Sequence, residues 1–596
     1  MQLGLRNLLL LFCFSYFIST FSALSYDGVT LLSLLSHWKS VPSSISSSWN
    51  ASDSTPCLWV GVECDNTQNL LSLNLTGFGI SGEIGPEIGH ISHLQTIDLS
   101  LNSFSGKIPP ELGNCSVLEY LDLSGNNLTG EIPSNLKNLQ KLQTLSLFDN
   151  FLSGEVPESL FQIPNLEYVI LSSNNLSGFI PASVGNVSKV FLYLGHNQLS
   201  GEIPSSIGNC RRLQELSLEE NQLTGGLPES FSNLKDLTYL NVRNNKFVGS
   251  IPSGLGNCKN LDFFDVSFNS LSGQIPPSLG NCSSLSKFAA LKNNIGGNIP
   301  SSFGQLNKLS VLNLPENHLS GKIPPELGNC TSLIQLQLFS NQLEGEIPSE
   351  LGKLTKLQDL QLQENRLTGE IPVSIWKIPS LEEILVYNNS LTGQLPLEMT
   401  ELKQLKNISV FNNQFSGIIP QGLGINSSLV QLDFTNNKFT GEIPPNLCFG
   451  KQLKFLIFGI NQLEGSIPSD VGSCSTISRL ILKQNNLTGF LPEFAKNPNL
   501  SFMDISNNSI SGEIPSSLEN CTNITSINLS MNKFTGSLTA LGNICSLKAV
   551  NVSNNDFTGS VPETLINLAK SSPSSFQGNP SLCLTCPPSR GSNCPV

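Results

Sequence analysis

The chain has 596 residues, of which 13% are charged, and its formal net charge is −13 at pH 7. Nothing in this acidic balance favours nucleic-acid binding, and a cationic partner fits it better. The 5 histidines are scattered and stand in no Ser/His/Asp or HExxH arrangement, so we expect no enzymatic activity and no cofactor.

Residues 1–23 have the pattern of a secretory signal peptide. One early charge, Arg6, precedes the apolar run LLLLFCFSYFI, which ends in small residues. A membrane anchor is the rival interpretation, but the run is short and the cysteine pattern beyond it suits an oxidising compartment. We therefore expect a protein that is secreted from the cell.

Residues 24–69 precede the repeated part of the chain. The apolar stretch VTLLSLLSHW predicts a helix. Cys57 and Cys64 follow, beside Trp59, and resemble the disulfide-closed cap of plant leucine-rich-repeat ectodomains. The alternative is a pair of unlinked buried thiols.

Residues 70–562 consist of copies of one unit, which is clearest in LEYLDLSGNNLTGEIP (Leu118–Pro133). Aligned on the asparagine equivalent to Asn126, the copies number 21 and repeat every 24 residues, with three steps of 23. This unit is similar to the leucine-rich repeat of plant extracellular proteins. It predicts an α/β-type solenoid with little helix, a right-handed superhelix with a parallel sheet on its concave face.

Each position of the unit has a physical reason. Leu121 and Leu123 alternate with Asp122, so one side of a short strand is buried. Asn126 can satisfy backbone groups of its own and the next turn, and Gly130 permits a tight bend. Since one unit cannot bury its leucines alone, we expect disulfide-bonded caps at both ends of the stack.

Cysteine recurs at one position of the repeat, where a small core residue is a better explanation than a metal ligand, because neither CxxC pairs nor histidines gather nearby. These residues are Cys115, Cys210, Cys258, Cys282, Cys330, Cys474 and Cys521. Cys448 lies 26 residues before Cys474, so a disulfide between neighbouring repeats is one possibility and two free thiols the other.

Residues 563–596 form a second predicted cap. We expect a disulfide between Cys583 and Cys594, which leaves Cys586 with Cys545 as a candidate partner. No apolar run of membrane-spanning length follows, and no kinase motif is present. The sequence thus predicts neither a membrane span nor a kinase in this chain.

Asn-x-Ser/Thr sequons occur 18 times, and many should carry sugar on the sides and the convex face. Candidate glycosylation sites are Asn50, Asn114, Asn127, Asn175, Asn281, Asn329, Asn426, Asn486 and Asn551.

The exposed strand positions change in character along the array. Glu219, Glu364 and Glu383 make this side acidic. Tyr387 and Phe411 occupy equivalent positions in successive repeats, about one strand spacing (~5 Å) apart, and predict an aromatic anchor. Two tolerated surface rings are the alternative.

A basic pair follows the acidic strands. Arg479 and Lys483 flank a buried run, and Asp433 lies two repeats earlier. An arginine can grip both oxygens of a carboxylate, so this end of the surface is a candidate site for a ligand's terminal or side-chain carboxylate.

Several stretches outside the repeat consensus resemble the ectodomain of the plant Pep-peptide receptor kinases. They are SYDGVTLLSLLSHW, NASDSTPCLWVGVEC, IPVSIWKIPSLEEILVYNN, LPLEMTELKQL, GLGINSSLVQLDFTNNKFTGEIPPNLC and SSPSSFQGNPSLC. The resemblance implies that an endogenous defence peptide lies extended on the concave face and that a somatic-embryogenesis-type co-receptor kinase docks at the C-terminal repeats. It also implies that Arg479, in TISRLIL, holds the peptide's C-terminal carboxylate and that Asp433 contacts the last residue.

Two departures from that family bear on function. The family's basic doublet is Ser478-Arg479 here, and several repeats are missing before Asn555, near the expected co-receptor site. We therefore expect a secreted peptide-binding ectodomain, located in the apoplast or, as part of a longer receptor, on the outer face of the plasma membrane. A soluble decoy of the full receptor, an inhibitor of a cell-wall hydrolase and a structural wall protein are alternatives, although inhibitor arrays of that kind have only about ten repeats.

Overall fold

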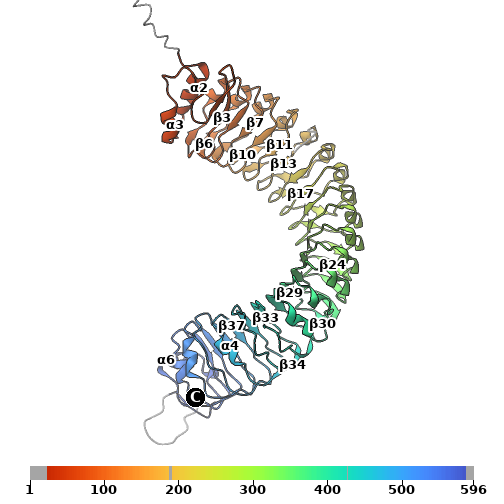
Figure 1. Ribbon diagram of the computed structural model, residues 1–596, viewed down its shortest axis with the longest axis vertical. Helices are drawn as coiled ribbons and strands as arrows, with labels where there is room; N and C mark the ends of the chain where they lie inside the picture. The colour runs from red at the N-terminus through yellow and green to blue at the C-terminus, as the bar shows by residue number, and fades with distance from the viewer. Residues whose placement is uncertain (1–22, 187–190, 426, 585–596) are drawn as a thin grey trace, which may run out of the picture. The chain divides into compact units, whose positions relative to one another are not determined.

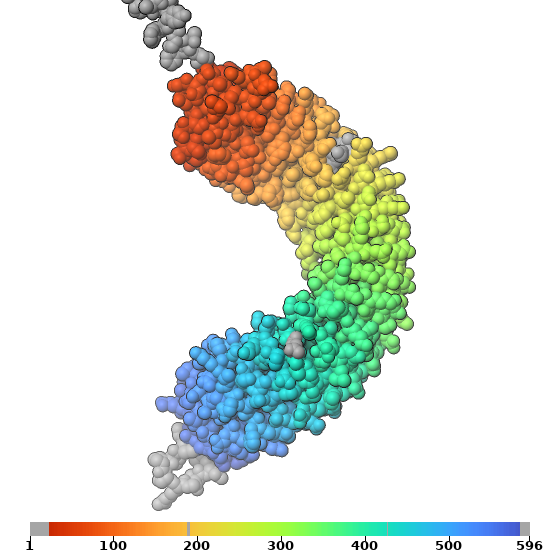
Figure 2. All heavy atoms as spheres, viewed as in Figure 1, coloured from red at the N-terminus to blue at the C-terminus, as the bar shows by residue number. Residues whose placement is uncertain are grey.

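The computed structural model describes residues 23–186, 191–425 and 427–584. They belong to two compact units, unit 1 (Met1–Ser272) and unit 2 (Gly273–Val596). Each unit is a stack of similar turns (Figure 1), and in Figure 2 the atoms of successive turns within a unit pack closely. The predicted leucine-rich-repeat solenoid, with a long parallel sheet and little helix, is confirmed in both units.

Every turn contributes one short strand to a parallel sheet on the concave face of its unit. In unit 1 the strands are β3 (Leu70–Asn74), β5 (Thr96–Asp98), β7 (Tyr120–Asp122), β9 (Thr144–Ser146), β11 (Tyr168–Ile170), β13 (Phe191–Tyr193), β15 (Glu215–Ser217), β17 (Tyr239–Asn241) and β19 (Phe263–Asp265). In unit 2 they are β21 (Lys287–Ala289), β23 (Val311–Asn313), β25 (Gln335–Gln337), β27 (Asp359–Gln361), β29 (Glu383–Leu385), β31 (Asn407–Ser409), β33 (Gln431–Asp433), β35 (Phe455–Ile457), β37 (Arg479–Ile481), β38 (Phe502–Asp504), β40 (Ser526–Asn528) and β42 (Ala549–Asn551).

Further short strands line one side of each stack, where the x-L-x-G part of the repeat lies. In unit 1 they form the sheet β1 (Trp38–Ser40), β4 (Ser81–Glu83), β6 (Ser103–Lys107), β8 (Asn127–Gly130), β10 (Phe151–Glu155) and β12 (Asn175–Ser177). In unit 2 one such sheet contains β22 (Gly296–Gly297), β24 (His318–Gly321), β26 (Gln342–Gly345), β28 (Arg366–Gly369) and β30 (Ser390–Leu391), and another contains β32 (Ser416–Ile418), β34 (Lys438–Glu442) and β36 (Gln462–Glu464). The turn then closes through a 3-10 helix such as η11 (Pro325–Asn329).

A ladder of buried asparagines joins each turn to the one before it. Asn413 donates from Nδ2 to the carbonyl oxygens of Val386, Val410 and Phe411 at 3.0, 3.0 and 3.2 Å, while its Oδ1 accepts the N–H of Leu391 at 2.9 Å. These are the groups that a bend without regular pairing would leave unsatisfied. The ladder extends one step past the last repeat recognised in the sequence, because Asn579 makes the same type of bonds to Val552, Phe576 and Phe557.

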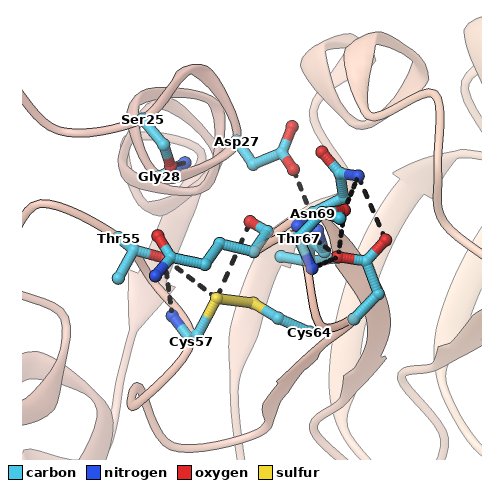
Figure 3. Close-up of a disulfide and its surroundings, with 11 residues drawn as sticks. Ser25, Asp27, Gly28, Thr55, Cys57, Cys64, Thr67 and Asn69 are labelled. Atoms are coloured by element: carbon cyan, nitrogen blue, oxygen red, sulfur yellow. Dashed lines mark hydrogen bonds between the residues drawn. A yellow bond between two sulfur atoms is a disulfide. The ribbon is translucent and has the colours of Figure 1, made fainter.

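The N-terminal cap contains two helices, α2 (Tyr26–Leu35) and α3 (Ser43–Ser48). The hydroxyl of Ser25 caps α2 by accepting the N–H of Gly28 at 3.3 Å, and the carboxylate of Asp27 accepts the N–H of Leu70 at 3.0 Å (Figure 3). This second bond ties the helix to the first strand of the stack. The predicted helix is therefore present, but it ends at Leu35, and Trp38 lies in strand β1.

Two predicted disulfides are present. Cys57 bonds to Cys64 in the N-terminal cap (Figure 3), and Cys448 bonds to Cys474 across neighbouring turns of unit 2. The second bridge decides between the alternatives left open by the sequence. It lies near α4 (Ser469–Ser473), in the turns that carry β33 and β35.

The other repeat cysteines are buried and form no disulfide, as expected for core residues. Burial raises the pKa of Cys115 to about 12, so this thiol stays protonated. Cys545 is different, because Ile544 fills the core position in its turn and Cys545 is a free, exposed thiol. The proposed partnership of Cys545 with the C-terminal cap is therefore wrong.

Some predictions fall on residues outside the described ranges. They concern the signal peptide, Asn426, Cys586 and Cys594, so the Cys583–Cys594 bridge stays a prediction. Within the described cap the chain forms α5 (Thr539–Gly542), α6 (Glu563–Ser571) and β44 (Ser581–Cys583). Of the sequons, Asn127, Asn175 and Asn486 are exposed on the lateral side, whereas Asn551 lies in β42 on the concave face, where we had not expected a sugar.

Candidate functional site

The concave face of unit 2 presents the first and last residues of each strand and the residue two positions beyond it. In β29 the middle residue Ile384 is buried, while Glu383 and Leu385 are half-buried. Tyr387 lies two residues past this strand and is also half-buried. The residues that differ between repeats are thus held on a sheet whose own backbone is rigidly paired.

Tyr387 and Phe411 form the predicted aromatic pair. Their ring centroids are 4.3 Å apart and their planes differ by 10°, so the rings are stacked. Burial and the charges of Glu364 and Glu383 raise the pKa of Tyr387, which keeps its phenol neutral. The pair provides a flat apolar step between acidic side chains, a suitable anchor for part of a ligand.

Amides and carboxylates run across the neighbouring strands as a hydrogen-bonded series. Gln337 donates to Asp359 at 2.6 Å, and Glu383 accepts from Gln361 at 2.8 Å and from Asn407 at 2.7 Å. The acidic side chains of this face are therefore held in place before any ligand arrives.

Two other acids belong to this surface. Glu364 is exposed and accepts the hydroxyl of Ser340 at 2.5 Å. One oxygen of Asp359 is buried without a hydrogen-bond partner, and burial together with the charge of Glu383 raises the pKa of Asp359.

Asp433 and Arg479 lie on strands β33 and β37, with β35 between them. Two strand spacings put the strands about 10 Å apart, so the two side chains leave room for a ligand residue between them. Asp433 accepts the N–H of Thr435 at 3.1 Å, and burial raises the pKa of its carboxyl group. Arg479 is exposed, with its guanidinium carbon 5.9 Å from the ring centroid of Phe502.

The predicted basic pair of Arg479 and Lys483 is unequal. The ammonium of Lys483 lies 4.0 Å from a carboxylate oxygen of Asp504, which compensates part of its charge. Within the described part of the chain, Arg479 forms no ion pair. Arg479 is therefore the cation of the two that is better placed to bind an external anion.

Glu219 lies in unit 1, where it accepts the hydroxyl of Ser217. The same concave face carries two stacked pairs that we did not predict, Tyr168–Phe191 at 4.4 Å and Tyr239–Phe263 at 4.5 Å. In each pair the two residues hold the first strand position of successive turns. An alignment of the repeats by strand position therefore contains the signal for both pairs.

The described residues contain neither a metal-binding cluster nor a membrane-spanning helix. These residues contain no group of three histidine, cysteine or acidic side chains arranged to hold a metal ion. None of their helices is both long and apolar enough to cross a bilayer.

Comparison with known proteins identifies the repeats. The leucine rich repeat N-terminal domain family matches residues 24–65, and leucine rich repeat families match residues 93–115, 116–176, 189–271, 308–330, 332–354, 428–449, 499–521 and 546–568. A receptor-like protein kinase of Ipomoea nil is 54% identical over 91 residues, and the kinase PEPR1 of Arabidopsis thaliana is 53% identical over 94 residues. Each match covers 15% of this chain and only 8% of the relative's length.

Solved structures match over nearly the whole chain. The structure of PEPR1–AtPEP1 is 51% identical, with a TM-score of 0.88, over 94% of this chain and 82% of that one. The Arabidopsis receptor kinase HAESA, in complex with the peptide hormone IDA and the co-receptor SERK1, is 35% identical with a TM-score of 0.84, over 94% of this chain and 99% of that one. By these similarities the chain belongs to the leucine-rich-repeat receptor-like protein kinases, of which it has the repeat ectodomain.

Proposed function

We propose that this chain binds an extended, cationic signalling peptide along the concave face of unit 2, on the outside of the plant cell. The observation that carries the proposal is the order of chemistry along one sheet. The acids Glu364 and Glu383 come first, the stack of Tyr387 and Phe411 follows, and the exposed cation Arg479 comes last.

This order suits a peptide that runs from the acidic strands toward Arg479. Basic side chains would lie over the acids, an apolar or flat group would rest on the stacked rings, and the free C-terminal carboxylate would meet Arg479. From β27 to β37 there are five strand spacings, or about 24 Å, which an extended peptide spans with roughly seven residues. Asp433 would contact the last residue.

The similar structures support this type of ligand. PEPR1 is in complex with AtPEP1, and HAESA is in complex with a peptide hormone and SERK1. We extend both to this chain as a proposal, with a Pep-type peptide as the ligand and a SERK-type ectodomain as the co-receptor at the C-terminal turns around β40 and β42.

Calorimetric titration with synthetic AtPEP1 tests the proposal. The peptide should be used with a free C-terminus and as its C-terminal amide, against the native chain and Arg479→Ala. We expect Arg479→Ala to weaken the acid form about 10- to 100-fold, because a charge-assisted bond contributes roughly 1.5–3 kcal/mol. The amide should lose less than about 3-fold.

Arg366→Ala is a suitable control, since Arg366 is exposed on strand β28 of the lateral sheet. Equal losses for the acid and the amide would refute the carboxylate role of Arg479. Addition of SERK1 ectodomain to the same samples, followed by size-exclusion chromatography, tests the co-receptor. A complex that forms equally well without peptide would count against a peptide-dependent co-receptor.

A further inference from the structure

A row of aromatic residues with one acid in it runs along the concave face of unit 1. The row occupies the first strand position from β11 to β19 (Figure 1), and its members, each paired in register with its neighbours, are Tyr168, Phe191, Glu215, Tyr239 and Phe263. Tyr168 stacks on Phe191, and Tyr239 stacks on Phe263. Glu215 therefore lies between two stacked pairs.

The stacking decides which ring faces are open to a ligand. The two rings of each pair are nearly parallel, with interplanar angles of 5° and 15°, so their faces are directed along the row. One face of each ring is covered by its partner. The other faces of Phe191 and Tyr239 are both directed toward Glu215 on β15, and the two rings are two strand spacings (~10 Å) apart. All three side chains are half-buried, so a ligand can reach them from solvent.

Tyr193 orients the carboxylate of Glu215. Its hydroxyl donates to Oε2 of Glu215 at 2.5 Å, and burial together with this hydrogen bond raises the pKa of Tyr193, so the phenol stays a donor. Among the described residues, Oε1 of Glu215 accepts no hydrogen bond. We call the space above this carboxylate, bounded by Phe191, Tyr193 and Tyr239, the Glu215 slot.

Glu383 in unit 2 shows what a fully satisfied acid at the same strand position looks like. It begins β29 as Glu215 begins β15, and its two carboxylate oxygens accept from Gln361 and Asn407. Its register neighbours are the polar residues Asp359 and Asn407. Glu215 differs, because it has ring faces on both sides where Glu383 has hydrogen-bonding side chains.

The nearest cation of the chain does not fill the Glu215 slot. Arg243 lies two residues beyond β17, and its guanidinium carbon is 4.7 Å from the ring centroid of Phe268, on the turn of β19 and so on the side of β17 away from Glu215. Within the described part of the chain, Glu215 forms no ion pair. The carboxylate is thus left for a cation from outside.

The charge and geometry of the slot both suit such a cation. Burial raises the pKa of Tyr239, and the charges of Glu219 and Asp265 raise it further, so the field around this ring is negative. A cation bound on the carboxylate of Glu215 would lie one strand spacing (~5 Å) from each ring, within the roughly 6 Å over which a ring face attracts a cation. A guanidinium fits best, because its plane can lie parallel to both rings while its N–H groups bond to the carboxylate.

We propose that the Glu215 slot binds one guanidinium group of a ligand, with Glu215 as its anionic partner and with Phe191 and Tyr239 as flanking rings. The slot lies in unit 1 and is separate from the strands β27 to β37 of the proposed function. An arginine side chain of the same peptide is one source of the guanidinium, and a second ligand is the other.

NMR titration of the full chain with Nα-acetyl-arginine amide tests the proposal, with Nα-acetyl-citrulline amide as a neutral compound of the same shape. We expect saturable binding of the arginine compound and at least about 10-fold weaker binding of the citrulline compound. Glu215→Gln should weaken the arginine compound about 10-fold, because a charge-assisted bond is lost. Tyr239→Leu should weaken it about 3-fold, because one ring face is lost.

Asp122→Asn is the matched control in unit 1. Asp122 also accepts the hydroxyl of a tyrosine, Tyr120, at 3.2 Å, but its register neighbours are Asp98 and Ser146 instead of rings. We expect this variant to change arginine binding by less than about 2-fold.

Three results would overturn the proposal. They are equal binding of the arginine and citrulline compounds, arginine binding that is unchanged in Glu215→Gln, and equal losses in Glu215→Gln and Asp122→Asn. The last would show a general attraction to the acidic surface. If Glu215→Gln does not fold, Tyr239→Leu decides the question, since only a ligand between the rings loses affinity with it.

Calorimetric titration of AtPEP1 into the native chain and into Glu215→Gln distinguishes the two sources. A loss of about 10-fold assigns the guanidinium to the peptide, because the lost bond is the same one. Unchanged affinity for AtPEP1, with arginine binding still lost, assigns it to a second ligand. Neither result alters the difference between acid and amide at Arg479, so the slot and the proposed function can fail separately.

Discussion

The concave faces of the two units share one backbone arrangement and differ in how their polar side chains are satisfied. In unit 1 the hydroxyl of Tyr193 donates to Glu215 at 2.5 Å, and that of Ser217 donates to Glu219. In unit 2, buried oxygens of Asp359, Gln363 and Ser409 have no partner among the described residues. Serine at the same strand position is thus satisfied in unit 1, by Glu219, and unsatisfied in unit 2, where Phe411 stands in the place of that acid.

The largest effect should come from the asparagine ladder, which both units contain. Asn221 in unit 1 and Asn413 in unit 2 each donate to three carbonyl oxygens and accept one backbone N–H. Replacing either with alanine should destabilise its surroundings by roughly 4 kcal/mol, about 1 kcal/mol for each lost bond.

Native-state hydrogen exchange measures this locally, which matters because a long repeat array need not unfold in one step. Gln414→Ala, at an exposed neighbouring position, is the control for unit 2. Clearly unequal costs for Asn221→Ala and Asn413→Ala would mean that the units differ in their scaffold as well as on their surface.

The disulfides give the next largest effect and should distinguish the units. Cys448–Cys474 closes a loop of sequence separation 26, whereas Cys57–Cys64 closes one of 7. In the chain-entropy description the longer loop stabilises by about 3.5 kcal/mol and the shorter by about 2.5 kcal/mol.

Paired serine substitutions at each bridge, followed by thermal unfolding, would test that order. We expect the Cys448→Ser/Cys474→Ser chain to lose more stability than the Cys57→Ser/Cys64→Ser chain. The reverse order would show that the contacts of Cys57 and Cys64 within the cap outweigh loop length.

The smallest effect concerns the acid that unit 2 leaves partly unsatisfied. Burial and the charge of Glu383 raise the pKa of Asp359 in the folded chain above its unfolded value. Between the unfolded and the folded pKa of Asp359, the folded state therefore binds more protons than the unfolded state. The native chain loses stability as pH rises through the raised pKa.

Asp359→Asn lacks this loss while keeping an oxygen for the amide of Gln337. We expect it to be more stable than the native chain at pH 7, by less than about 1 kcal/mol because the site is partly exposed, and to lose that advantage below about pH 4. Urea unfolding at several pH values checks this. An advantage that persists at pH 3 would have to arise from something other than the charge.

The periodicity of the sequence predicts most of the fold but only part of the candidate site. The 24-residue repeat predicts the strands, the asparagine ladder and the contact of Tyr387 with Phe411, because equivalent residues of successive turns must lie one strand spacing apart. The same rule applied to the first strand position would have found Tyr168 with Phe191.

Other features depend on single side chains and could not be predicted in this way. Lys483 reaches Asp504 on the next strand, and Ser409 finds no partner, because of side-chain conformations that the repeat does not constrain. A shift of one position puts Ile544 in the core and exposes Cys545, although the sequence there still resembles the other turns.

The asparagine ladder also affects how the number of turns in such a chain can change during evolution. Asn413 bonds to Val386, 27 residues before it, and to Leu391, 22 residues before it. Asn221 makes the two equivalent bonds at the same sequence separations. If unequal recombination deletes or duplicates one whole turn, every remaining asparagine still meets its partners. The length of the array can therefore drift in a lineage at little cost to folding, so that selection on its length acts mainly through the molecules it must span.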